Sequence, residues 1–163
     1  MDGKLRNMTS VYLISEQGIL CLYRIGSRVA NNKYIGSAGG HFEKDELNDP
    51  EKCVLRELRE ELGLLESDLE GLSLRYITHR LMEGEIRQNY YFFACLREEK
   101  ELSSTEGQLR WVPFEALDDL PMPVSAKHMI LHYRKEGRYT ETLYGGITQA
   151  TGTVFVPLEE FEG

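Results

Sequence analysis

Three glutamates that share one face of a predicted helix are the residues of this sequence with the clearest potential for chemistry. They are Glu57, Glu60 and Glu61. At about 100° per residue, their side chains fall within about 100° of one another. The leucines of the same segment fall within about 60° of one another on the opposite side, and we expect this stripe to face the core. These are Leu55, Leu58 and Leu62.

Carboxylates at helical spacing repel one another, at a cost of about 0.2–0.5 kcal/mol per pair. Cations placed among them remove that cost. Hard divalent ions such as Mg²⁺ favour clustered oxygen ligands and keep waters and substrate phosphates as further ligands, and Mn²⁺ is accommodated by the same donors. For the helix taken alone, a solvated acidic face is the alternative interpretation.

The sequence around this helix resembles the Nudix box. The pattern of that family is Gly, five residues, Glu, seven residues, and then Arg-Glu-aliphatic-any-Glu-Glu-any-Gly-aliphatic. Here Gly40 and Glu46 are followed by the run from Arg56 to Leu64. Two extra residues separate Glu46 from Arg56. We place them in the loop 47–50, before the helix, where they leave the spacing of the glutamates unchanged.

The resemblance implies an α+β fold, an α/β/α sandwich around a mixed β-sheet, in which a loop, a helix and a second loop hold divalent metal. It also implies hydrolysis of a nucleoside diphosphate linked to a group X, by attack of water on phosphorus. Metal ions neutralise phosphates and lower the pKa of a bound water. The protein then contributes mainly positioning and charge stabilisation.

The resemblance also assigns roles to individual residues of the box. The carboxylates of Glu57, Glu60 and Glu61 and the carbonyl of Gly39 correspond to metal ligands. Arg56 corresponds to an arginine that orients a catalytic glutamate by ion pairing.

Residues around this set receive supporting roles. Glu46 matches a supporting acid, and Gly63 matches the turn that ends the helix. Gly39, Gly40 and His41 are expected to bind the substrate phosphates. For His41, a structural role is the alternative.

Two further candidates lie outside the box. The loop from Thr105 to Gln108, followed by Trp111, resembles a loop of MutT-like nucleotide-pool enzymes in which a remote glutamate reaches the metal site. Glu106 is therefore the candidate for an additional metal ligand or a general base, with an exposed loop acid as the alternative. Arg24 matches a position at which such enzymes place a substrate-contacting arginine, and a salt bridge or surface position is its alternative.

These residues fit three functions. The first is Mg²⁺-dependent hydrolysis of a nucleoside triphosphate, including oxidised ones such as 8-oxo-dGTP, to the monophosphate and pyrophosphate. Against a preference for 8-oxoguanine, residues 121–125 contain no asparagine, although MutT-like enzymes carry a base-reading asparagine in this region. The second keeps the chemistry but acts on ADP-ribose, a dinucleoside polyphosphate or a nucleotide sugar. The third is a module that binds a nucleotide without hydrolysis, a class in which the box is usually degenerate.

Local patterns predict the elements that position these residues. Strands are expected over 9–14 and 19–25, over 72–81 and 85–96, and over 108–112. Helices are expected from the Asp49-Pro50 cap to Leu62, over 114–120 and over 124–136, and the Gly-rich stretch 27–40 is expected to be an irregular loop. Residues 1–137 are predicted to form the Nudix domain, with 138–163 as a C-terminal β-hairpin extension packed on it.

Composition limits the partners. A chain of 163 residues suits one domain, and its formal net charge of −8 disfavours nucleic acid polymers and anionic membranes as partners. A small nucleotide is compatible with that charge if cations reverse it locally. Three widely spaced cysteines and the lack of a long apolar stretch indicate a cytoplasmic protein. The tail 138–163 either covers the pocket or forms the interface of a homodimer, and its composition does not choose between the two.

Overall fold

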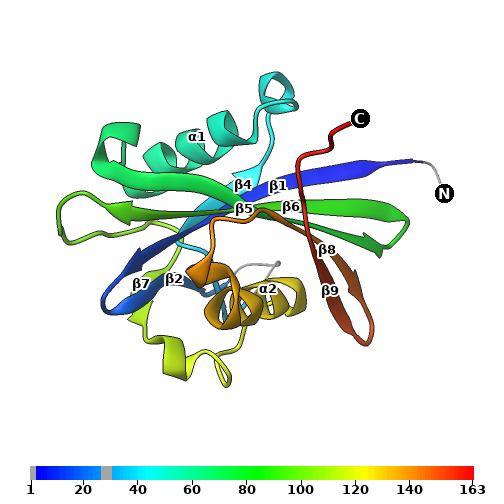
Figure 1. The fold of residues 1–163 in the computed structure, drawn as a ribbon. Helices are drawn as coiled ribbons and strands as arrows, with labels where there is room; N and C mark the ends of the chain where they lie inside the picture. Colours follow the sequence, from blue (N-terminus) through cyan, green and yellow to red (C-terminus); the bar gives the residue numbers. More distant parts are fainter. Residues whose placement is uncertain (1–2, 27–30) are drawn as a thin grey trace.

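A mixed β-sheet with one long helix on each face forms the fold (Figure 1). The computed structural model describes residues 3–26 and 31–163. Within these residues the sheet has nine strands in the order β3-β2-β1-β6-β5-β8-β9, with β4 paired to β1 and β7 paired to β2. The strands are β1 (Leu5–Ser15), β2 (Gly18–Arg24), β3 (Lys33–Ile35), β4 (Ala38–His41), β5 (Leu69–Met82), β6 (Glu85–Leu96), β7 (Gln108–Val112), β8 (Tyr144–Gln149) and β9 (Gly152–Pro157).

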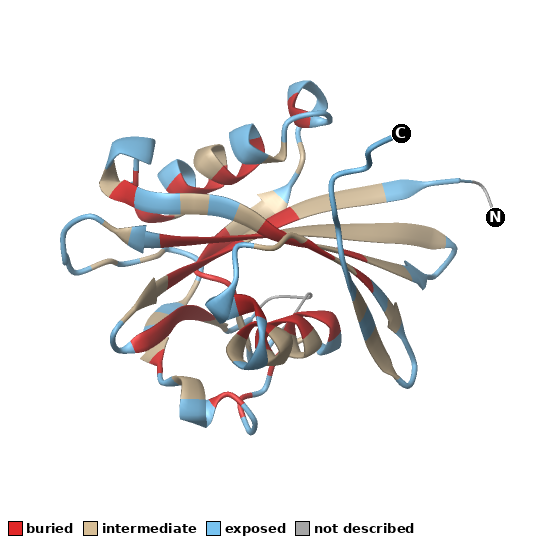
Figure 2. Ribbon diagram, in the orientation of Figure 1, coloured by how far each residue is buried: buried red, intermediate tan, exposed pale blue. Residues whose placement is uncertain are grey.

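Helix α1 (Pro50–Leu62) lies above the sheet in Figure 1 and helix α2 (Val124–Lys135) lies below it. Buried residues concentrate in the sheet and on the helix faces turned toward it (Figure 2). They form two clusters, one that contains Leu58 of α1 and one that contains Ile130 of α2. This layered arrangement confirms the predicted α/β/α sandwich. No helix in the described ranges is long and apolar enough to cross a membrane.

The predicted strand pairs of the central sheet are confirmed. Strands β1 and β2 form an antiparallel hairpin, as do β5 and β6. Between these hairpins, β1 and β6 run parallel, with Thr9 opposite Tyr90. The remaining parallel pair joins β5 to β8, with Ile77 opposite Gly145.

The predicted signals for α1 are confirmed at both ends of the helix. The Asp49 side chain accepts a hydrogen bond from the Lys52 N–H (3.0 Å), and Pro50 occupies the first turn. Gly63 ends the helix in a left-handed conformation (φ 68°) that glycine adopts without strain, and its N–H donates to the Arg59 carbonyl (3.0 Å).

The expectation of an irregular loop over residues 27–40 is wrong at residues 33–35 and 38–40, which form β3 and most of β4. Residues 27–30 lie outside the described residues, but β3 pairs with β2 and β4 pairs with β1. The pairing of β4 with β1 requires the glycine at position 39, because a Cβ at Gly39 would collide with the Thr9 carbonyl oxygen. The local composition indicated a loop, and pairing with a distant strand overrode it.

The short helix expected over 114–120 is only the 3₁₀ turn η3 (Phe114–Ala116). The N–H of Leu117 donates to the Phe114 carbonyl, and the N–H of Leu120 donates to the Leu117 carbonyl. These bonds span three residues each, so the segment makes tight turns instead of an α-helix. The other 3₁₀ turns are η1 (Lys44–Glu46), η2 (Glu66–Asp68) and η4 (Gly137–Tyr139).

The C-terminal segment forms the antiparallel hairpin of β8 and β9. Strand β8 continues the main sheet beyond β5, and the hairpin descends past α2 on the same side of the sheet (Figure 1). Phe155 of β9 packs against Tyr76 and His132, with ring centroids 5.6 and 4.5 Å apart. The hairpin therefore contributes to the packing around α2.

Candidate active site

One arginine holds three of the acidic side chains of this region. Arg56 donates from Nε and Nη2 to the two carboxylate oxygens of Glu46 (2.6 and 3.1 Å). Its Nη1 donates to Glu57 (2.8 Å) and to Glu60 (3.1 Å). Glu46 is 1% exposed, and its hydrogen bonds with Arg56 lower the pKa of its carboxyl to about 2. The charged, bidentate pair with Glu46 thus fixes the position of the Arg56 side chain.

Glu57 points toward the sheet, not toward solvent. It is 9% exposed, and burial raises the pKa of its carboxyl above the usual value. Its carboxylate lies so close to β4 that a Cβ at Gly40 would collide with Glu57 Oε1. The expected core-facing stripe is confirmed for Leu58 and Leu62, which are buried, whereas Leu55 is only half-buried. Glu57, which the helical wheel places on the opposite side, is buried as well. The missing side chain of Gly40 leaves the space that the carboxylate fills.

Glu61 lies one turn further along α1 and meets the same strand. Its Oε2 accepts a hydrogen bond from the Gly39 N–H (3.3 Å). Burial, followed by the negative charge of Glu57, raises the pKa of Glu61 to about 7, and Glu106 adds to the effect. The carboxylates of Glu57, Glu61 and Glu106 therefore act on one another electrostatically.

Glu106 is brought to this place by strand pairing. Its loop leads into β7, which pairs with β2 so that Gln108 lies opposite Tyr23. Its carboxylate forms an ion pair with Arg24 at the end of β2 (3.1 Å, side chains 44% and 28% exposed). Both residues proposed from outside the box thus lie together, although 82 positions separate them in the chain.

Two predicted residues lie apart from the buried carboxylates. Glu60 is at the exposed side of α1, with 57% of its side chain accessible. His41 Nε2 accepts a hydrogen bond from Arg6 Nη2 (3.1 Å), and the His41 backbone carbonyl accepts one from Arg56 Nη2 (3.1 Å). His41 therefore connects to the site through its backbone, while its ring lies with β1.

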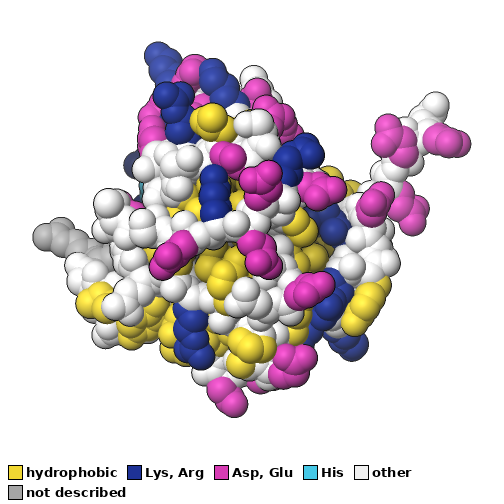
Figure 3. Space-filling model, turned by 90° about the vertical axis from the view of Figure 1, so that its left-hand side faces the viewer, with side chains coloured by type: hydrophobic (Ala, Val, Ile, Leu, Met, Phe, Trp, Pro, Cys, Tyr) yellow, Lys and Arg dark blue, Asp and Glu magenta, His cyan; other side chains and the backbone are white. Residues whose placement is uncertain are grey.

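A second acidic group lies just before α1. In the described part of the chain, Glu43, Asp45 and Glu46 place ligand atoms within 4.8 Å of one another, and the three box glutamates are not gathered in this way. Two of its three carboxylates already have a cationic partner, because Glu46 binds Arg56 and Asp45 binds Lys52 (2.6 Å). Charged side chains of both signs gather in this layer, at the top of Figure 3.

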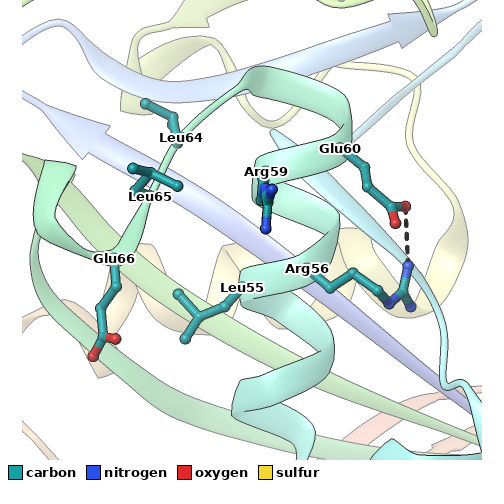
Figure 4. Close-up of a pocket in the computed structure, with 7 residues that line it drawn as sticks. All are labelled: Leu55, Arg56, Arg59, Glu60, Leu64, Leu65 and Glu66. Carbon is teal, nitrogen blue, oxygen red and sulfur yellow. Dashed lines mark hydrogen bonds and ion pairs between the residues drawn. The ribbon is translucent and has the colours of Figure 1, made fainter.

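A hollow of ≈ 470 Å³ lies on the outer side of α1 (Figure 4). Arg56 and Glu60 stand at its edge, joined by their hydrogen bond. Its other lining residues are Leu55, Arg59, Leu64, Leu65 and Glu66. Glu57 and Glu61 are not among them, so the hollow is separate from the buried carboxylates.

Sequence reasoning missed a row of arginines on the other face of the sheet. Arg6 lies opposite Arg87 in the β1–β6 pair, and Arg87 lies opposite Arg80 in the β5–β6 pair. The three are far apart in sequence, so only the strand register could have revealed that they are neighbours.

Comparison with known proteins places these features in one family. A family model described as "NUDIX domain" matches residues 4–133. A search among curated proteins finds no match.

Several solved structures share the fold. The mutator MutT protein from Bacillus halodurans aligns with a TM-score of 0.64 and 22% identity, over 93% of this chain and 97% of its own. The MutT protein from Methanosarcina mazei Go1 aligns with a TM-score of 0.67 and 18% identity, over 85% of this chain and 99% of its own. A MutT NUDIX hydrolase from Burkholderia pseudomallei aligns with a TM-score of 0.60 and 25% identity, over 79% of this chain and 97% of its own.

Proposed function

The chain belongs to the Nudix hydrolase family, and from that premise we propose that it is a Mg²⁺-dependent hydrolase that cleaves a nucleoside triphosphate to the monophosphate and pyrophosphate. The observation that carries the proposal is the packing of Glu57 and Glu61 against the glycines of β4, with Arg56 behind them. The MutT proteins among the structural relatives support the nucleotide-pool type of substrate.

The donor set fits a hard divalent ion. Glu57 and Glu61 are carboxylates that burial and mutual repulsion disfavour as anions, and a cation between them relieves both effects. All the available donors are oxygen atoms, which favours Mg²⁺, with Mn²⁺ also accommodated. The ligands we propose are Glu57, Glu60, Glu61 and the Gly39 carbonyl, with Glu106 as an additional ligand. When bound, the ion neutralises phosphate charge and activates water.

The side chains divide the remaining work. Arg56 orients Glu57 and Glu60 through its Nη1 hydrogen bonds. Arg24 is held by Glu106 in the free protein, and we infer that it exchanges this partner for a substrate phosphate. Gly39, Gly40 and His41 lie on β4 beside the carboxylates of α1 and are the proposed contacts to the substrate phosphates.

The proposed reaction needs one proton acceptor. The water oxygen bonds to phosphorus, and the P–O bond between the α- and β-phosphates breaks with its electron pair moving to the leaving group, either pyrophosphate or the nucleoside monophosphate. The water proton passes to a carboxylate. Glu61, whose carboxylate is held against β4 by the Gly39 N–H, is the first candidate acceptor. Glu106 is the second candidate, since its negative charge acts on Glu61 from another loop.

A product-release assay tests the proposal. Nucleoside triphosphates, oxidised triphosphates and ADP-ribose-type compounds are incubated with Mg²⁺ and either the wild-type protein or Glu61→Gln. We expect a triphosphate to be the best substrate and the variant to lose at least about 100-fold in kcat. Glu66→Gln is the matched control, because Glu66 is exposed on the outer side of α1 and should leave activity unchanged.

Other outcomes identify the alternatives. Greater activity on ADP-ribose, a dinucleoside polyphosphate or a nucleotide sugar than on any triphosphate would replace the proposed substrate and keep the chemistry. Binding of a nucleotide without turnover of any compound would indicate a sensor module and overturn the proposal.

A further inference from the structure

Strand β9 forms an open edge of the sheet. It is the last strand in the sheet order, and among the described residues only β8 pairs with it. Figure 1 shows the hairpin β8–β9 at the side of the sheet away from β7. An edge strand offers unpaired N–H and C=O groups to a further strand, and bulges, charged side chains or proline usually prevent such pairing. The register of β8 with β9 has no bulge, and β9 carries only Pro157 at its end.

One hydrogen bond identifies the backbone groups that point to this edge. The Leu158 N–H donates to the Leu143 carbonyl (2.8 Å), so it points toward the neighbouring strand. In an antiparallel pair, successive residues point their backbone groups to opposite sides of the strand. The N–H and C=O groups of Thr153 and Phe155 therefore point away from β8. Pro157 has the same direction, but it has no N–H to donate.

The hairpin that carries this edge is uncharged and apolar on its outer face. Residues 144–157 contain no Asp, Glu, Lys or Arg, although 28% of the chain is charged and its net charge is −8. Val154 and Val156 are 59% and 55% exposed. They point away from α2, because Phe155 between them packs against His132 of that helix. Two copies of this acidic chain can therefore meet at the hairpin without repulsion between charged side chains.

We propose that β9 pairs antiparallel with β9 of a second copy of this chain, so that the two sheets become continuous across a twofold axis. Such an axis brings the same surface of both copies together. In the register with Thr153 of each copy opposite Phe155 of the other, both outward N–H groups of each copy find a carbonyl, and Pro157 is not needed. The axis then passes beside Val154, which lies opposite Val154 of the second copy.

The charges that flank the hairpin favour a second copy as the occupant of this edge. Three exposed acids follow β9 in the chain: Glu159, Glu160 and Glu162. Antiparallel pairing sends these acids of the two copies to opposite ends of the interface. Each acidic tail then leaves beside the end of the other copy's β5 that carries Arg80, the residue after His79, which lies opposite Ile147 of β8. In the described part of the chain, Arg80 binds the Ser125 hydroxyl (3.1 Å) instead of an acid.

The proposed interface is small, because two six-residue strands meet mainly through main-chain hydrogen bonds. Interfaces at the low end of the size range form transient complexes, so we expect a dissociation constant of about 10–100 µM. Of the two roles expected for the tail 138–163, an interface fits the structure better, since the hollow beside α1 is lined by residues between positions 55 and 66. Pairing of β9 is independent of the proposed reaction, whose carboxylates lie on α1.

Sedimentation velocity tests the association. The wild type, Val154→Lys and Val124→Lys are compared from about 1 µM to about 500 µM, a range that brackets the expected dissociation constant. Val154→Lys places two lysines opposite each other at the axis, where like charges are destabilising, so we expect at least about tenfold weaker association. Val124→Lys is the matched control, because Val124 is 58% exposed but lies at the start of α2. A wild type that stays monomeric throughout, or equal weakening by both substitutions, would overturn the inference.

Hydrogen exchange of the unsubstituted protein tests the strand pairing itself. In one copy the N–H groups of Thr153 and Phe155 are open to solvent, whereas those of Val154 and Val156 point toward β8. At a concentration that pairs about nine-tenths of the chains, exchange at Thr153 and Phe155 should be about tenfold slower than in the monomer. Val154 and Val156 should exchange slowly in both states. A dimer in which Thr153 and Phe155 exchange as fast as in the monomer would show that the copies meet elsewhere and would overturn the inference.

Cysteine cross-linking tests the register. Val154→Cys and Val156→Cys are each combined with Cys95→Ala, because Cys95 is an exposed free thiol. Opposite residues of a non-hydrogen-bonded pair have Cα atoms about 4.5 Å apart, within the range of a disulfide, so Val154→Cys should cross-link on mild oxidation. Position 156 lies opposite Gly152 of the second copy, four residues or about 13 Å from its own counterpart, so Val156→Cys should not cross-link. A cross-link at position 156, or none at position 154, would overturn the proposed pairing.

Discussion

Single residues control whether the acidic face of α1 can approach the sheet. Glu57 is buried, a position that a carboxylate occupies only with strong partners. Arg56 supplies one partner, and the missing side chain at Gly40 supplies the space. Each requirement depends on one residue, Arg56 or Gly40, so a small change at either position should disturb the site.

Gly40→Ala tests this dependence on space. The added methyl group would collide with the Glu57 carboxylate and displace it, and misplacement of this size costs about 100-fold in rate. We expect kcat to fall by about that factor while the far-UV circular dichroism remains that of the wild type. Gly145→Ala is the control, because its new Cβ would meet only ordinary contacts, the nearest at 3.6 Å. Equal activity of both variants would contradict the argument.

The pair of Glu46 and Arg56 predicts how stability depends on acid. Folding lowers the pKa of Glu46 from 4.5 to about 2. The pair's contribution is therefore fully present above pH 4.5 and is lost as the pH falls toward 2. The integrated loss is about 3 kcal/mol. Urea titrations between pH 6 and pH 2 measure it.

Glu46→Gln supplies the comparison for that titration. The variant should be less stable at pH 6 and should lose less of its stability on acidification. A slope identical to that of the wild type would show that Glu46 is not the group responsible.

At the scale of elements, the accuracy of prediction follows the range of the interactions. Helix α1 could be predicted to the residue, because its cap at Asp49 and its end at Gly63 are local signals. The hairpins β1–β2 and β5–β6 were equally visible, since their turns lie between adjacent strands. Strands β3 and β4 were not, because they exist only by pairing with β2 and β1. Local composition carries no information about such partners.

The hairpin β8–β9 and α2 meet at His132, which predicts a second pH dependence. The ring lies between Tyr144 and Phe155, and burial lowers the pKa of His132 below 6.5. The unfolded chain therefore binds this proton more readily, so stability is full above pH 6.5 and falls as the pH drops below that value. Thermal melts from pH 8 to pH 5 should show the decrease.

His132→Gln should flatten the melting temperature in this window. His79→Gln provides the matched control, because His79 is a histidine on β5 and lies in a different part of the sheet. If both variants retained the wild-type pH dependence, the effect would have to come from another group.

At the scale of the whole molecule, the candidate site is an assembly of distant segments. The box on α1 was recognisable from sequence, since its residues lie within one stretch of chain. The ion pair of Arg24 with Glu106 required the pairing of β2 with β7. The alignment of Arg6, Arg87 and Arg80 required the register of three strands. The buried direction of Glu57 was missed because a helical wheel locates a face but not what covers it. Pairing between distant strands thus determined the positions of residues that the local sequence pattern could not predict.

The assembly of these segments couples the pKa of Glu61 on α1 to the charge of Glu106 in the loop before β7. The Glu106 charge raises the pKa of Glu61, so Glu106→Gln should lower the pKa of Glu61 below about 7. Carboxyl-selective NMR titration of the metal-free protein measures this value directly. Glu101→Gln, which neutralises an exposed acid before the same loop, should leave it unchanged. Because Glu106 reaches Glu61 only if β7 pairs with β2 in this register, an unshifted pKa in Glu106→Gln would contradict both the electrostatic link and the placement of the loop.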